Sequence, residues 1–153
     1  MKARSITLVM AMAASMAGFS QLPASAEAPV AVEIDAHPTQ FCCPEIGTWE
    51  MSGPITDSGS YVRTFAATSP PDRQFGVLGP FREILVFTGL LGTLTVREEV
   101  RDTEQGVTGV WQIASGTGAY EDASGHGTVA FFANPDADPK FTLALTGVIS
   151  KAS

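Results

Sequence analysis

After position 29 the apolar residues tend to recur at every second position, and Gly, Pro, Asp or Ser interrupts them about every eight to twelve residues. Such alternation is typical of strands with one buried face, and the regular breaks are typical of turns. Outside the first 26 residues, no stretch combines helical spacing with capping residues and sufficient length. The pattern predicts strands at 30–34, 47–52, 60–68, 83–88, 92–101, 107–115, 127–133 and 140–150.

The expected fold is all-β, with about eight strands in an antiparallel barrel. A closed barrel of about eight strands has an interior that side chains fill or that holds one small ligand. The chain of 153 residues has room for one hydrophobic core and no more. We expect residues 27–44 to form an N-terminal arm or a leading strand, and residues 45–153 to form the barrel domain.

Residues 1–26 have the features of a secretory signal peptide and are excluded from the fold prediction. A short basic segment precedes an uncharged apolar run at 6–19, and residues 24–26 have the small-x-small pattern of a cleavage site. The run is shorter than the roughly 20 residues that a membrane span needs, and no later run approaches that length. We therefore predict cleavage near Ala26, a secreted or periplasmic location, and no membrane association of the mature form.

The chain is acidic, with 9 Lys and Arg against 16 Asp and Glu and a net charge of −7. Because Lys2 and Arg4 would leave with the signal peptide, the mature protein would keep 7 bases against 16 acids, a net charge of −9. This sign excludes a general nucleic-acid-binding protein. A hydrophobic content of 44% and a charged content of 16% exclude a disordered acidic tail and a coiled coil.

The alternation within two expected strands turns charged side chains toward the barrel interior. Within 92–101, Glu98 is in phase with aliphatic residues, and within 60–68, Arg63 is in phase with aromatic residues. A buried carboxylate needs a partner or a raised pKa, and both conditions recur at catalytic centres. The residues expected to share the inward faces are Tyr61, Phe65, Leu94, Val96 and Val100.

Two interpretations of Glu98 and Arg63 stay open. In the catalytic interpretation, Glu98 acts as an acid, a base or a cation stabiliser, and Arg63 holds an oxyanion. In the structural interpretation, the two residues form an ion pair, or a bulge after Val96 turns Glu98 to solvent.

The segment 116–125 has the sequence Gly-Thr-Gly-Ala-Tyr-Glu-Asp-Ala-Ser-Gly and joins two expected strands. Gly116 and Gly118 permit backbone angles that are closed to other residues, and we expect a tight helical turn at 119–124 that Gly125 ends. Tyr120 is expected to pack beneath this turn. The glycine spacing is not that of a phosphate-binding loop.

The pattern Gly-Thr-Gly-x-aromatic-x-x-Ala-x-Gly in this segment resembles the signature of the dirigent and allene oxide cyclase-like barrels. The resemblance extends over residues 92–150. It implies an eight-stranded antiparallel barrel, often trimeric, with an apolar cavity. Members of these families direct the coupling of phenoxy radicals made by another enzyme, or cyclise a fatty-acid epoxide. The motif marks the scaffold through its turn and packing positions Gly116, Gly118, Tyr120, Ala123 and Gly125.

Cys42 and Cys43 are adjacent, and in an exported protein both thiols are open to oxidation. A bond between neighbours closes a strained ring, because their Cα atoms lie only about 3.8 Å apart. The alternatives are a vicinal disulfide, a disulfide to another chain, and a metal site that adds His37 and Glu45. That set has no recognised zinc spacing, so a disulfide is favoured, and no metal or cofactor is expected.

Three function classes follow from these observations. The favoured class is an exported barrel that binds a lipophilic or aromatic small molecule in an apolar cavity. The second is a cyclase-like, isomerase-like or dirigent-like enzyme on the same barrel, and the third is an oligomerising interaction protein without a cavity. With two histidines and no nucleophile-elbow sequence, a Ser-His-Asp hydrolase is not expected. The predicted cavity-lining residues are Trp49, Tyr61, Phe65 and Trp111.

Overall fold

The structure, a computed structural model, describes residues 27–41, 44–67, 80–103, 106–136, 138 and 140–151, with the backbone alone for 65–67. The predicted signal peptide and the pair Cys42 and Cys43 lie outside the described residues. Cleavage near Ala26 and the disulfide therefore stay predictions.

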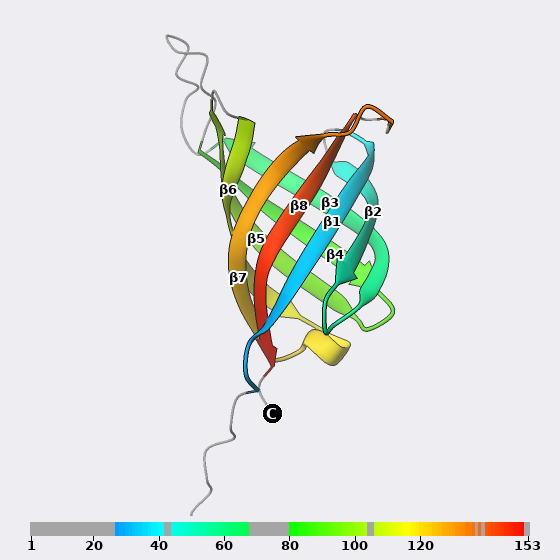
Figure 1. The fold of residues 1–153 in the computed structure, drawn as a ribbon, viewed down its shortest axis with the longest axis vertical. Helices are drawn as coiled ribbons and strands as arrows, with labels where there is room; N and C mark the ends of the chain where they lie inside the picture. Colours follow the sequence, from blue (N-terminus) through cyan, green and yellow to red (C-terminus); the bar gives the residue numbers. More distant parts are fainter. Residues whose placement is uncertain are drawn as a thin grey trace, which may run out of the picture.

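Eight antiparallel strands follow one another around a closed barrel, so the predicted all-β fold is confirmed (Figure 1). Each strand pairs with the next along the chain, and β1 pairs with β8 to close the ring. The strands are β1 (Val30–Gln40), β2 (Glu45–Ser52), β3 (Asp57–Ala67), β4 (Phe81–Gly89), β5 (Thr93–Thr103), β6 (Gly106–Gly116), β7 (Ala123–Ala133) and β8 (Phe141–Lys151).

Some strands extend beyond their predicted limits because a neighbouring strand pairs with the added residues. β1 continues past residue 34 to Gln40, and this half pairs with β2. β7 begins at Ala123 rather than at residue 127, since its first residues pair with the end of β8. The predicted helical turn is correspondingly shorter: η1 (Gly118–Tyr120) is its helical part, and Gly125 lies within β7 instead of ending the turn.

The inward phase predicted for β5 is present, and it buries Glu98. Its side chain is 1% exposed, as expected for a residue in phase with Val96 and Val100. The register between β5 and β6 does shift, but Ser115 and Ile113 pair with consecutive residues of β5, so the extra residue is in β6. The alternative that a bulge turns Glu98 to solvent is therefore wrong.

Buried apolar side chains from all eight strands form the core inside the barrel. Trp49 and Trp111 are each 2% exposed, and their indole N–H groups donate to the carbonyl oxygens of Thr88 and Thr146, each at 3.3 Å. Such bonds satisfy the polar edge of a buried indole. The other large apolar side chains in this core include Ile34, Tyr61, Leu85, Phe87, Leu94, Leu143, Leu145 and Ile149.

The short helix η1 lies at one end of the barrel, which we call the η1 end (Figure 1), and Tyr120 is its last residue. Its side chain is fully buried, and its hydroxyl donates a hydrogen bond of 3.0 Å to Oδ2 of Asp57. Asp57 also accepts hydrogen bonds from the backbone N–H groups of Leu90 and Leu91. The carboxylate of Asp57 thus connects η1 to the β4–β5 turn through hydrogen bonds. Within the described residues, no helix is long and apolar enough to cross a membrane.

The glycines of the 116–125 segment permit this arrangement. Gly118 has a φ of 62°, a left-handed conformation that side chains disfavour. A Cβ atom at Gly116 would lie 2.1 Å from the carbonyl oxygen of Tyr120. The packing of Tyr120 beneath the turn therefore requires the small residue at position 116.

Replacing Tyr120 with Phe should lower the free energy of unfolding by about 1–2 kcal/mol, because Asp57 would lose a buried hydrogen bond. The backbone N–H donors to Asp57 remain, so the barrel should still form. Chemical denaturation of both proteins measures the difference. An unchanged free energy of unfolding would show that the Tyr120 hydroxyl contributes nothing to stability.

Candidate functional site

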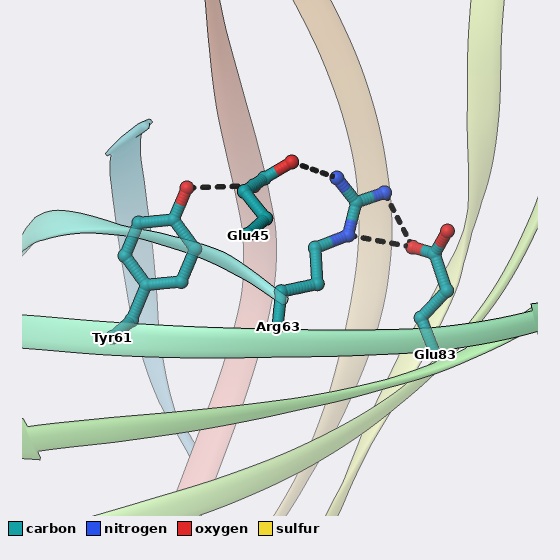
Figure 2. Close-up of polar contacts among 4 residues, drawn as sticks. All are labelled: Glu45, Tyr61, Arg63 and Glu83. Carbon is teal, nitrogen blue, oxygen red and sulfur yellow. Dashed lines mark hydrogen bonds and ion pairs between the residues drawn. The ribbon is translucent and has the colours of Figure 1, made fainter. Parts of the chain in front are cut away.

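Four polar residues from three neighbouring strands meet inside the barrel. Arg63 on β3 donates through Nε to Oε2 of Glu83 on β4 at 2.9 Å, and through Nη1 to Oε2 of Glu45 on β2 at 3.0 Å. A further hydrogen bond joins Nη2 of Arg63 to Oε2 of Glu83. Tyr61 donates its hydroxyl to Oε1 of Glu45 at 2.7 Å. Figure 2 shows the resulting chain of contacts, Tyr61–Glu45–Arg63–Glu83, which we call the Arg63 network.

The Arg63 network is buried, and the pKa values of Arg63 and Tyr61 determine the charges of these two side chains. Burial by itself would lower the pKa of Arg63, but the carboxylates of Glu83 and Glu45 outweigh burial and raise it. Burial and the hydrogen bond to Glu45 raise the pKa of the Tyr61 hydroxyl above its ordinary value. Arg63 is therefore charged and Tyr61 neutral at physiological pH. All three nitrogens of the guanidinium are engaged by carboxylates, and two N–H groups, one on each Nη, are left for the predicted oxyanion role of Arg63.

Glu98 on β5 lies directly across from Glu83 on β4. Unlike the residues of the Arg63 network, it makes no hydrogen bond through either carboxyl oxygen of its side chain to a described residue. Burial, which is the largest effect, and the nearby Glu83 and Glu45 raise the pKa of Glu98 to about 8, although Arg63 opposes them. Glu98 is therefore mostly protonated at pH 7.

A pocket of about 210 Å³ opens at the end of the barrel opposite the η1 end, and we call it the end pocket. Arg63, Glu83 and Asp102 are the charged residues of its wall, and the others are Phe and Val. The guanidinium carbon of Arg63 lies 4.8 Å from the ring centroid of Phe131, a cation–π contact. The residues that line the end pocket are Phe41, Arg63, Phe81, Glu83, Val100, Asp102, Val107 and Phe131.

Of the predicted site residues, Arg63 and Glu98 come together in the interior, where Glu98 contributes to the pKa of Arg63. Trp49, Tyr61 and Trp111 are packed in the core and do not line the end pocket. The side chain of Phe65 lies outside the described residues. Ligand contacts by these four aromatic residues stay predictions.

The sequence interpretation missed Glu83 and Glu45 as interior groups. Glu83 is in phase with Leu85 and Phe87, so the alternation of β4 contains the signal for an inward carboxylate. Glu45 precedes the predicted strand 47–52, but β2 begins at Glu45, in phase with Trp49. The wall of the end pocket was also missed, because its aromatic residues come from strand ends that are far apart in the sequence.

Two further observations limit the choice of site. A groove of about 400 Å³ on the barrel's outer side is lined by Arg97, Gln112 and His126, which project away from the interior. The predicted site residues Glu98 and Trp111 also border this groove, although their side chains are buried in the barrel. In the part of the chain that the structure describes, no group of three His, Cys, Asp or Glu residues is arranged to hold a metal ion. The end pocket joins Phe and Val side chains to the buried Arg63 and Glu83.

The fold and this site define a small closed β-barrel with a pocket at one end. No protein-family model, no curated protein and no solved structure matches the chain significantly. Of the resemblance to dirigent and allene oxide cyclase-like proteins, the eight-stranded antiparallel barrel is the part that the structure confirms.

Proposed function

We propose that the protein binds a small lipophilic or aromatic molecule in the end pocket. The single observation that carries this proposal is a pocket whose walls are mostly Phe and Val and whose interior side presents Arg63 and Glu83. Binding sites for small molecules combine apolar walls with a few polar groups that orient the ligand. The predicted export places this binding outside the cytoplasm, and the resemblance extends the proposal to a homo-oligomer, a trimer in those families.

The size of the end pocket limits the ligand. An apolar cavity of about 150 Å³ is enough to hold benzene, so a pocket of about 210 Å³ can take one substituted ring. It falls below the range of about 300–1,000 Å³ that is typical of sites for drug-sized molecules. A monocyclic ligand is therefore favoured over an extended fatty-acid chain.

An isomerase-like, cyclase-like or dirigent-like enzyme is the second candidate, and Glu98 is the observation that favours it. A carboxyl group with a pKa of about 8 can act as a general acid at neutral pH, and it faces Glu83, which lines the end pocket. Binding remains the leading proposal because Glu98 is not itself among the residues that line the end pocket. The third class, an interaction protein without a cavity, leaves the pocket unexplained.

Replacing Val107 with Trp should lower the affinity for a monocyclic probe such as benzyl alcohol by about tenfold or more, because the indole would occupy the end pocket. Val110, 58% exposed on the outward face of the same strand, gives the matched control Val110→Trp, which should bind like the unmodified protein. A ligand-observed NMR titration measures both affinities, and circular dichroism checks the fold. Equal affinities in the two variants would place binding outside the end pocket.

A further inference from the structure

The buried groups around the end pocket carry an excess of negative charge. Glu45, Glu83 and Glu98 are at most 4% exposed, and Arg63 is the basic residue buried with them in the described part of the chain. When Glu98 is protonated, the negative charges of Glu45 and Glu83 still outnumber the positive charge of Arg63 by one. A ligand with one positive charge would make this cluster neutral.

Carboxyl oxygens in this cluster also lack donors. Both hydrogen bonds from Arg63 to Glu83 go to Oε2, and Figure 2 shows the other oxygen of Glu83 directed away from the guanidinium. Neither oxygen of Glu98 has a partner among the described residues, although its side chain is 1% exposed. Buried polar atoms are nearly always hydrogen-bonded, so each exception calls for a missing partner. A protonated Glu98 is itself a donor, whereas the free oxygen of Glu83 can only accept, so a hydrogen-bond donor is the partner that Glu83 lacks.

We propose that the end pocket binds a primary organic ammonium ion, with its N–H groups directed at Glu83 and its apolar part against Phe41, Phe81 and Phe131. This inference rests on the proposed function, because it names the ligand class for the same pocket. Hydrogen bonds between an ammonium and a carboxylate are about twice as strong as neutral ones. Aromatic faces add attraction for a cation.

An anionic ligand fits the same pocket less well. Three of the five N–H groups of Arg63 are already bound to Glu45 and Glu83, so an anion would compete with two carboxylates for the guanidinium. Breaking a buried ion pair is costly because a charge is left without a partner. Asp102, which also lines the end pocket, would repel an anion further.

Three probes of one shape test the inference on the unmodified protein: benzylammonium, benzyl alcohol and benzoate, titrated at pH 7 by calorimetry or ligand-observed NMR. Benzylammonium should bind about tenfold more tightly than benzyl alcohol, and benzoate should bind most weakly. Glu83→Gln should remove most of this preference while benzyl alcohol still binds. Glu99→Gln, on the exposed face of β5, is the matched control and should keep the preference.

The outcomes separate the inference from the proposed function. Equal binding of benzylammonium and benzyl alcohol would overturn the ammonium inference and leave binding in the end pocket intact. Tightest binding of benzoate would also overturn it and would assign recognition to Arg63. Binding of none of the three probes would overturn both. Because these comparisons use the unmodified protein, they decide the question even if Glu83→Gln fails to fold.

Discussion

Replacing Arg63 with Met is expected to lower the free energy of unfolding by about 3–5 kcal/mol, because Glu45 and Glu83 would lose a buried cationic partner. Both carboxylates are at most 4% exposed, so water cannot replace the guanidinium. Small domains have a total stability of only about 5–15 kcal/mol. The variant should therefore unfold at much lower denaturant concentration, which a guanidinium titration at pH 7 measures.

Arg82→Met is the matched control for this experiment. Arg82 lies on the neighbouring strand, its side chain is 70% exposed, and its nitrogen is 3.8 Å from a carboxyl oxygen of Glu99. Exposed pairs of this kind contribute about 0–1 kcal/mol. If Arg63→Met and Arg82→Met had the same small effect, the Arg63 network would not be a significant source of stability.

The fold was predictable because the alternation of apolar and polar residues within each strand indicates which side chains face inward. Strict alternation on β5 indicated an inward Glu98, and alternation on β3 indicated an inward Arg63; both are buried. This information is local, since a residue's phase along a strand does not depend on which strand lies beside it.

The composition of the site was not predictable in the same way. Arg63 meets Glu45 because β2 and β3 pair in a register that places them opposite one another, and it reaches Glu83 diagonally on β4. Register between strands depends on turn lengths and barrel closure, which alternation does not report. The Glu98–Arg63 ion pair, one of the alternatives left open by the sequence, is not formed: Arg63 pairs with Glu45 and Glu83, and no hydrogen bond joins Glu98 to another described residue.

The unpartnered Glu98 leads to the second large expected effect, a stability that falls as pH rises. The pKa of Glu98 is raised from its ordinary 4.5 to about 8, first by burial and then by Glu83 and Glu45, with Arg63 opposing. Between these two values the unfolded chain releases the Glu98 proton and the folded protein keeps it. Glu98 therefore removes up to about 1.4 kcal/mol of stability for each pH unit in this window, and the loss levels off above pH 8.

Glu98→Gln should abolish this dependence, because an amide of similar shape stays neutral at every pH. Relative to the unmodified protein, the variant should gain stability by a few kcal/mol between pH 5 and pH 9, measured by denaturant titration at each pH. Subtracting one free energy of unfolding from the other at each pH leaves the contribution of Glu98, because all other titratable groups are common to both proteins. Tyr61 does not contribute in this range, since its raised pKa keeps it neutral.

Glu99→Gln is the control for position, because Glu99 is the next residue on β5 and faces outward. It should retain the fall in stability that Glu98 causes. If Glu98→Gln and the unmodified protein had parallel stability profiles from pH 5 to pH 9, the folded protein would not hold the Glu98 proton. Glu98 would then be an ionised carboxylate that the Arg63 network stabilises, and its role as a neutral acid beside the end pocket would be excluded.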